Sequence, residues 1–295
     1  MNRLLPSLLA LVCAGIVHAQ FVSAWTQVLP SSAVELRDPR SISLTSDGLL
    51  YVADTGHHRI LAVDTLGRVL YETGGFGTAH GQFQWPRKIV ANRGASVWVL
   101  DYGNRRIEKF SRTLQYQGTF TIPPSDDGAL SQIEAFALAP QGDVYVFDRD
   151  DGQIVRYDPL FRELGKFGDR SGEEFVSTIS QMTFAPSIGL TWWARGSDKV
   201  RATDPLFSAV RTLSLPGPED QFVLAATDSC ILMANSSIVQ TWCDPTVPPT
   251  LLFRMQDLQK LEVRRLDDLA VAADGTVWLL DGLSGAVFRL FVTKR

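Results

Sequence analysis

Short apolar segments alternate with polar turns along the chain, and one such pattern occurs six times. In each unit an aromatic or aliphatic segment ends near a polar residue, and a short loop and a second apolar segment follow. The segments are residues 51–54, 98–101, 145–148, 192–195, 232–235 and 278–281, spaced by 47, 47, 47, 40 and 46 residues. In the fourth segment Arg195 stands where the first three have Asp. A regular period of this length is typical of repeat folds.

Each unit contains several apolar segments with the length of β-strands. In the first unit they are residues 41–45, 49–53, 60–63 and 69–72. The turn Asp47-Gly48 predicts a hairpin, because glycine tolerates the positive φ of a tight turn. No segment has a helical period. The pattern therefore predicts an all-β fold, a six-bladed β-propeller of four-stranded antiparallel blades.

The last unit is one strand short. It has apolar segments at 269–273, 276–280 and 286–291, and then the sequence ends. The spare apolar segment at 21–29 can supply the missing strand. We predict that this N-terminal strand pairs with residues 286–291 and closes the ring.

The first residues have the three parts of a signal peptide. Arg3 supplies a positive charge, residues 4–17 are mostly apolar, and Val17-His18-Ala19 places small residues before a cleavage site. The alternative is a membrane anchor, but the apolar run is shorter than the roughly 20 residues that span a bilayer. We predict a signal peptide at 1–19, a propeller at 20–295, and export to the periplasm or the medium.

Charge and hydropathy narrow the classes of partner. The chain has 28 Lys and Arg against 32 Asp and Glu, a net charge of −4. Phosphate binding needs concentrated basic residues, so this balance argues against a nucleic-acid partner. No later segment is apolar for long enough to cross a membrane. We expect a monomer that does not span a membrane.

Two stretches resemble the NHL repeat. The first runs from Pro39-Arg40-Ser41-Ile42 through Asp54-Thr55-Gly56-His57-His58-Arg59-Ile60 to Gly81-Gln82-Phe83. The second runs from Pro86-Arg87-Lys88-Ile89 through Asp101-Tyr102-Gly103-Asn104-Arg105-Arg106-Ile107. The resemblance implies a six-bladed propeller. Family members are mostly protein- or RNA-binding modules, and a minority are metal-dependent lyases, so the resemblance supports the fold more than an activity.

Strand order assigns residues to one end of the propeller, which we call the loop face. In a four-stranded blade, the loop between the second and third strands lies at the same end as the connection to the next blade. The loop face therefore carries His57, His58, Asn104 and Arg105. The expected residues at the entrance of the central channel are Arg40, Arg87, Lys88, Glu134, Gln181, Gln221, Asp267 and Asp268.

This entrance is expected to be basic across blades one and two and acidic across blade six. Such a rim suits a mixed-charge ligand, for example an extended peptide. The alternative is a solvated rim around a water-filled channel.

Acidic residues end several of the repeated segments, and two arginines follow them. The positions are Asp54, Asp101, Asp148 and Asp281, with Arg59 and Arg106 after the first two. A carboxylate at a strand end can accept backbone N–H bonds within the next loop. Because an active site is needed only once, repetition favours a structural role.

Catalytic chemistry has few candidate residues. Beyond the signal peptide the histidines are His57, His58 and His80, a weak basis for a zinc site. A lactonase-type calcium site could use Glu134 with Asp267 or Asp268, but Arg87 and Lys88 would oppose a cation. We therefore expect no cofactor and no resident metal. The leading hypothesis is a non-enzymatic scaffold that binds a protein, peptide or glycan; the alternative is a metal-dependent lyase or lactonase.

Two cysteines remain after the predicted cleavage. Cys230 and Cys243 flank a hairpin centred near Ser236 and Ser237, so a regular register places them opposite each other. Cβ atoms of such pairs are near disulfide distance. An oxidising compartment would close a disulfide there; the alternative is two buried thiols.

Overall fold

The structure is a computed structural model. It describes residues 20–30, 34–92, 96–122, 131–168, 178–204, 206–215, 221–244, 246–258, 261–272 and 274–294. The predicted signal peptide lies outside these residues. In the described part of the chain, no helix is long and apolar enough to cross a membrane.

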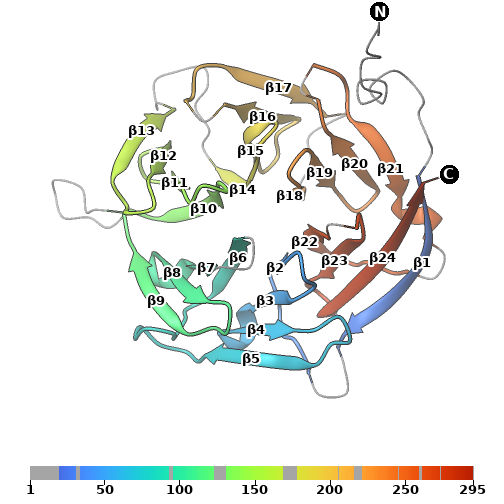
Figure 1. The fold of residues 1–295 in the computed structure, drawn as a ribbon, viewed down its shortest axis with the longest axis horizontal. Helices are drawn as coiled ribbons and strands as arrows, with labels where there is room; N and C mark the ends of the chain where they lie inside the picture. Colours follow the sequence, from blue (N-terminus) through green and yellow to red (C-terminus); the bar gives the residue numbers. More distant parts are fainter. Residues whose placement is uncertain are drawn as a thin grey trace, which may run out of the picture.

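Six antiparallel sheets of four strands surround a central axis, and each sheet is one blade of a propeller (Figure 1). The architecture predicted from the period is confirmed. Blades one to three contain β2 (Ser41–Leu44), β3 (Leu50–Asp54), β4 (Arg59–Val63) and β5 (Val69–Gly74); β6 (Pro86–Asn92), β7 (Ser96–Asp101), β8 (Arg106–Ser111) and β9 (Tyr116–Phe120); and β10 (Ile133–Leu138), β11 (Val144–Asp148), β12 (Gln153–Tyr157) and β13 (Glu163–Phe167).

Blades four to six complete the ring. Their strands are β14 (Ile179–Ala185), β15 (Gly189–Ala194), β16 (Lys199–Thr203) and β17 (Val210–Ser214); β18 (Val223–Ala226), β19 (Ile231–Ala234), β20 (Ile238–Trp242) and β21 (Thr250–Arg254); and β22 (Leu266–Val271), β23 (Val277–Asp281), β24 (Ala286–Lys294) and β1 (Gln20–Leu29). Three short 3₁₀ helices also occur in the described residues: η1 (Thr55–His57), η2 (Tyr102–Asn104) and η3 (Met255–Asp257).

The predicted closing strand is present. β1 pairs with β24, with Trp25 opposite Leu290 and Leu29 opposite Val287. Figure 1 shows the two ends of the propeller, β1 in blue and β24 in red, side by side in one blade. Leu29 is fully buried, and Trp25 lies edge-on to Phe288 at 5.7 Å. The ring is therefore joined by backbone hydrogen bonds between its two ends.

The core lies between neighbouring blades, and this explains the repeated apolar segments. The second strand of a blade is covered on both faces, so β3, β7, β11 and β23 are buried along their whole length. The outermost strand β5 is mostly exposed. Each large side chain buried between blades contributes about 1.5–3 kcal/mol. The aromatic residues that marked the period are therefore core residues.

A second repeated feature lies in the turn between the third and fourth strands. Asp64 accepts hydrogen bonds from the backbone N–H groups of Leu66 (2.9 Å) and Arg68 (3.0 Å). Asp158 does the same for Leu160 and Arg162. These side chains satisfy amides that no strand can pair, and they stabilise a tight turn.

The cysteine prediction agrees with the structure. β19 and β20 pair with Ile231 opposite Trp242, so Cys230 and Cys243 follow as the next facing pair. They form a disulfide, with Cα atoms 4.0 Å apart. The crosslink closes the end of this hairpin in blade five.

Candidate functional site

Two cavities follow the propeller axis. The first opens at the loop face, has a volume of 530 Å³, and is called the mouth below. The second, of 470 Å³, lies toward the opposite end and is called the lower channel. Lys88 and Met182 line both cavities, so the boundary between them lies at these side chains.

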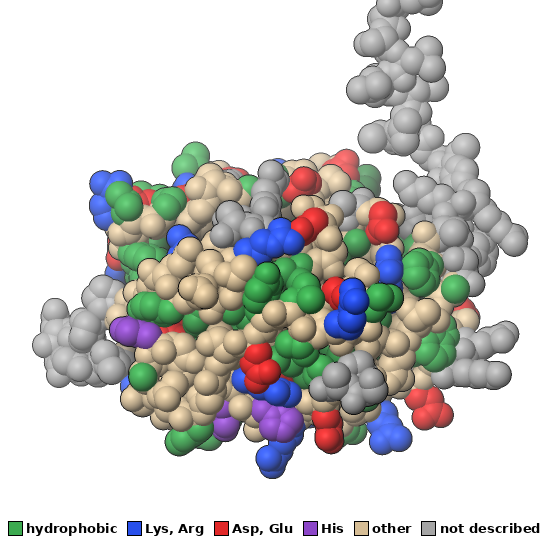
Figure 2. Space-filling model, turned by 60° about the horizontal axis from the view of Figure 1, so that its bottom comes forward, with side chains coloured by type: hydrophobic (Ala, Val, Ile, Leu, Met, Phe, Trp, Pro, Cys, Tyr) green, Lys and Arg blue, Asp and Glu red, His purple; other side chains and the backbone are tan. Residues whose placement is uncertain are grey.

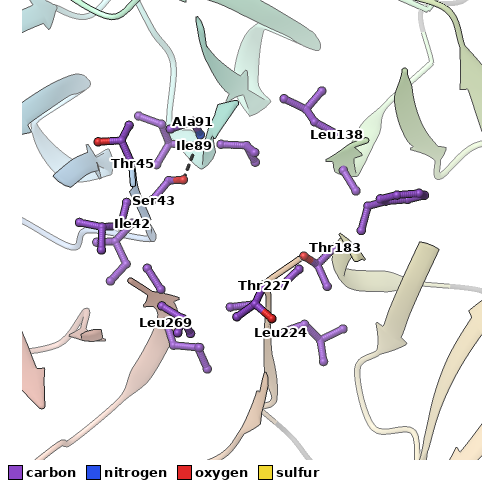
Figure 3. A pocket seen from close by; sticks show the side chains of 18 of the residues that line it. Ile42, Ser43, Thr45, Ile89, Ala91, Leu138, Thr183, Leu224, Thr227 and Leu269 are labelled. Carbon is purple, nitrogen blue, oxygen red and sulfur yellow. Dashed lines mark hydrogen bonds between the residues drawn. The ribbon is translucent and has the colours of Figure 1, made fainter. Parts of the chain in front are cut away.

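The lower channel is lined by both apolar and polar side chains. Figure 3 shows Ile42, Ile89, Leu138, Leu224 and Leu269 around it, each contributed by the innermost strand of a different blade. Its polar lining consists of serine and threonine side chains together with Asp228 and, at the boundary, Lys88; the Ser43 hydroxyl accepts the backbone N–H of Ala91 at 2.9 Å. The charged chemistry of the channel is therefore concentrated at the mouth.

The mouth contains nearly all of the entrance residues predicted from the sequence. Only Asp268 does not line the cavity; it lies buried close by and contacts Lys88. The predicted residues that do line it are Arg40, Arg87, Lys88, Glu134, Gln181, Gln221 and Asp267.

β-Bulges position several of these side chains. The innermost strand shifts register between Pro86 and Lys88, and again between Ile133 and Ala135. Blades four and six have equivalent shifts, between Ile179 and Gln181 and between Leu266 and Asp268. A bulge leaves one residue unpaired and re-aims its side chain. The extra residues at these shifts are Arg87, Glu134, Ser180 and Asp267, and all four line the mouth.

Where blade six meets blade one, four charged side chains form a closed ring. Arg40 lies 3.0 Å from Asp38 and 3.2 Å from Asp267. Arg265 contacts the same two carboxylates, each at 2.6 Å. Burial raises the pKa of Asp267 although Arg265 and Arg40 oppose this effect. At Asp38 burial also acts to raise the pKa, but hydrogen bonds and charges from Arg265 and Arg40 outweigh this effect and lower the pKa.

A buried ion pair joins blades two and six. The Lys88 ammonium lies 2.9 Å from the carboxylate of Asp268, whose side chain is 1% exposed. Asp268 also accepts hydrogen bonds from the Ser41 hydroxyl and from the backbone N–H groups of Ile42 and Leu269. This carboxylate therefore connects the innermost strands of blades six, one and two.

Arg87 is held between blades two and three. Its guanidinium lies 3.4 Å above the centre of the Tyr102 ring and 3.3 Å from Glu134. The Tyr102 hydroxyl donates a hydrogen bond to Glu134 at 3.1 Å, and Arg149 lies 3.7 Å from the same carboxylate. Arg87, on the expected basic side of the entrance, is thus paired with a carboxylate of blade three.

The loop-face residues have individual roles. The Asn104 amide donates to Asp101 (2.6 Å) and to the carbonyl of Gly77 (2.9 Å), so it fixes the loop that precedes blade two. Arg105 is exposed, with a left-handed backbone at φ 54°. The imidazole of His58 accepts the Trp85 backbone N–H at 3.2 Å and lies edge-on to Phe76.

The repeated acidic residues accept backbone N–H groups, but Asp54 and Asp101 take them from the segment before their blade and not from the next loop. Asp101 accepts from the Gln84 N–H and from Arg106, while Asp54 accepts from the Arg37 N–H and from Arg59. Asp148 and Asp281 accept two backbone N–H groups each from the loop that follows them. Arg106 also donates to the carbonyls of Thr78, Ala79 and Gln82.

The three histidines considered for zinc each have a separate partner. His57 contacts Asp54 at 2.9 Å, whereas His80 stacks on Tyr116 and lies 3.7 Å from Glu108. Figure 2 shows histidine side chains (purple) at separate places on this side of the molecule. Among the described residues, no group of three or more His, Cys, Asp or Glu is arranged to hold a metal ion.

Comparisons with known proteins address the fold. The family model of the NHL repeat matches residues 36–63, which include β2, β3 and β4. The chain is a six-bladed β-propeller with an NHL repeat. The NHL-repeat resemblance noted in the sequence is thereby confirmed for blade one, and no curated protein matches the sequence.

Solved propellers resemble the whole ring. A streptogramin B lyase is 12% identical with a TM-score of 0.59, covering 92% of this chain and 98% of the other. A catalytically inactive virginiamycin B lyase from Staphylococcus aureus, solved with quinupristin, is 12% identical with a TM-score of 0.61, covering 92% and 87%. A presumed exported protein from Bacteroides fragilis is 10% identical with a TM-score of 0.62, covering 94% and 95%. At such identities the likeness shows the fold alone.

The structure corrects the sequence alignment of blade four by one residue. The bulge that places Ile133 opposite Asp148 in blade three places Ile179 opposite Ala194 in blade four. Ala194 therefore occupies the position of the repeated aspartate, and Arg195 follows it and lines the mouth. In blade five Asn235 takes the aspartate's role and accepts the N–H groups of Ser237 and Ile238.

Sequence reasoning also missed Trp85. Its side chain is 53% exposed and lines the mouth, and its backbone has φ 56°, a conformation that bulky residues rarely adopt. The hydrogen bond from its N–H to His58 supports this conformation. The sequence signal was an aromatic residue directly before Pro86 at the entrance of blade two.

Proposed function

We propose that this chain is an exported scaffold that binds a protein, peptide or glycan partner at the mouth and performs no chemistry on it. Support for export comes from the signal-like segment at 1–19, the Cys230–Cys243 disulfide and the likeness to a presumed exported protein. Disulfides persist mainly in oxidising compartments.

The mouth itself carries the proposal. It is a cavity of 530 Å³ to which all six blades contribute, and its volume lies within the usual range of ligand sites. Most of its charged groups are held by ion pairs before any ligand arrives. Preorganised groups lose little conformational entropy on binding, so they favour recognition.

An exposed aromatic side chain extends the site at its rim. Trp85 lines the mouth, and beside it His58 contacts the exposed ring of Phe76. Aromatic surface of this kind commonly anchors peptides and sugars, because a large rigid ring buries much area. The mouth thus combines fixed charges with an aromatic anchor.

Site-specific photo-crosslinking tests the proposal. Trp85 is replaced by benzoylphenylalanine in one variant, and Ser46, which lines the lower channel at the opposite end, in a control variant. We expect a partner from the native extract to crosslink at the mouth position alone. Crosslinking at both positions, or only at Ser46, would contradict the proposal.

The affinity of a captured partner should then depend on Arg87. Arg87→Gln removes a half-exposed cation whose loss leaves no fully buried charge, and we expect at least about tenfold weaker binding. Arg68→Gln is the matched control, because Arg68 pairs with Asp64 on an outer turn. Lys88 is not suitable for this test, since it neutralises the buried Asp268.

The second candidate is a metal-dependent lyase or lactonase. The observation that favours it is the likeness to streptogramin B and virginiamycin B lyases. It requires stoichiometric Zn²⁺ or Ca²⁺ in the purified protein. Elemental analysis that finds neither ion, after purification without chelators, would remove this candidate.

A further inference from the structure

One cation in the mouth has no carboxylate of the described residues beside it. Arg40, Arg87 and Lys88 each lie within 3.3 Å of an acidic side chain. Arg195 lines the same cavity and is exposed, yet it makes no hydrogen bond or ion pair with any described residue. The uncompensated positive charge of the mouth is therefore on blade four, away from the predicted basic side.

An amide oxygen on the same blade also lacks a partner. The Oε1 atom of Gln181 is buried and accepts no hydrogen bond from any described residue. The side chain of Gln221, by comparison, donates to the carbonyl of Leu266 at 2.6 Å. Buried polar atoms are nearly always satisfied, so an unpaired acceptor that borders a cavity indicates a donor supplied from outside.

The two groups belong to one hairpin. Gln181 on β14 is paired with Trp193 on β15, and Arg195 is two residues beyond Trp193. Figure 1 shows β14 as the innermost strand of its blade, facing the axis. Trp193 and Met182 are buried apolar side chains of the same two strands, and they also line the mouth. We call these four residues the blade-four subsite.

We propose that the blade-four subsite binds the C-terminal end of a peptide. The terminal carboxylate pairs with the Arg195 guanidinium, and the last backbone N–H donates to Gln181 Oε1. Met182 and Trp193 contact the last side chain. This inference rests on the proposed function and names the ligand chemistry that the mouth recognises.

The chemistry of the two groups selects this ligand. A guanidinium forms strong, often bidentate hydrogen bonds with a carboxylate. Every peptide C-terminus carries such a carboxylate and an amide N–H close to it, so a single ligand satisfies both groups. A phosphate offers additional negative charge, for which the mouth has no second uncompensated cation among the described residues. An acidic sugar offers a carboxylate and hydroxyl donors, and it is the competing class in the test.

The test compares three small probes: N-acetyl-trialanine with a free carboxylate, its C-terminal amide, and an ester analogue in which oxygen replaces the last N–H. Binding to the full mature chain is measured by NMR titration at millimolar probe concentrations. We expect the carboxylate form to bind about tenfold or more tightly than the amide, and several-fold more tightly than the ester.

Variants assign each effect to its residue. Arg195→Gln should bind the free acid and the amide equally, and Gln181→Met should bind the peptide and the ester equally. Arg211→Gln is the matched control, because Arg211 is an exposed arginine on the outer strand β17 of the same blade, and it should behave as wild type.

Three results would overturn the inference: equal affinity for the acid and the amide, no binding of any probe, or tighter Arg195-dependent binding of galacturonate than of the peptide acid. The proposed function fails separately. A partner that crosslinks at Trp85 and binds equally well to Arg195→Gln would leave the mouth as the binding site and refute only the carboxylate subsite.

Discussion

Replacing Lys88 by Met should destabilise the propeller although the side chain lies at the edge of a cavity. The change keeps most of the side-chain volume and removes the ammonium group. It leaves the carboxylate of Asp268, which is 1% exposed, without its counter-ion. The structure therefore predicts a loss of stability from electrostatics and not from packing.

The size of the effect follows from the remaining partners. Removing one member of a buried ion pair typically costs about 3–5 kcal/mol. Asp268 keeps three donors, the Ser41 hydroxyl and the backbone N–H groups of Ile42 and Leu269, so we expect the lower end, about 3 kcal/mol. For a domain of this size that corresponds to a decrease in Tm of roughly 6–12 °C.

A double-mutant cycle isolates the interaction. Free energies of unfolding are measured in urea for Lys88→Met, Asp268→Asn and the double variant. The double variant should be more stable than Lys88→Met, because Asn at 268 carries no unpaired charge. Arg68→Met is the control, since its exposed pair with Asp64 should contribute less than about 1 kcal/mol.

The reasoning is refuted if Lys88→Met unfolds at the same urea concentration as wild type. It is also refuted if the two single effects simply add, because the groups would then be energetically independent.

Three further predictions concern ring closure, the crosslink and pH. Deleting residues 20–30 removes β1 and exposes the edge of β24, so thermal unfolding should occur at lower temperature and aggregation should increase. Reducing the Cys230–Cys243 bond should cost about 3 kcal/mol, measured by urea unfolding with and without reductant; mass spectrometry that finds both thiols free in the native protein would contradict the crosslink. Because the pKa of Asp38 is lowered in the folded state, its contribution to stability is present above about pH 4 and is lost as pH falls through the folded pKa. Wild type should therefore lose more stability than Asp38→Asn on acidification, and parallel curves would contradict this.

The fold could be predicted from the sequence because the features that indicate it are formed by residues close together in the chain. Strand lengths, turn residues and the facing positions of Cys230 and Cys243 all depend on residues close together in the chain. The closing strand β1 was predictable by elimination, since one blade lacked a strand and one apolar segment was unused. The order of strands within each blade also predicted the residues at the channel entrance, and most of them line the mouth.

The interactions within the mouth could not be read in this way. Lys88 and Asp268 are 180 residues apart, and Arg40 and Asp267 are 227 apart, so only the closed ring brings them together. A list of mouth residues therefore did not show that most of the charges compensate one another.

Arg195 was missed because the sequence alignment placed it at the repeated aspartate position. Matching the equivalent bulges of blades three and four puts Ala194 at that position and leaves Arg195 at the cavity. Comparing the residue that follows each strand-ending aspartate would have found Tyr102 and Arg149, which contact Glu134 at the same rim.

Hydrogen–deuterium exchange of the protein with its captured partner tests the central claim, that the mouth is the binding site. The account predicts slower exchange in residues 55–58, 84–88 and 195–197, which border the mouth, and unchanged exchange in residues 45–48 and 227–230 at the opposite end. Protection confined to the opposite end or to the outer strands would contradict it.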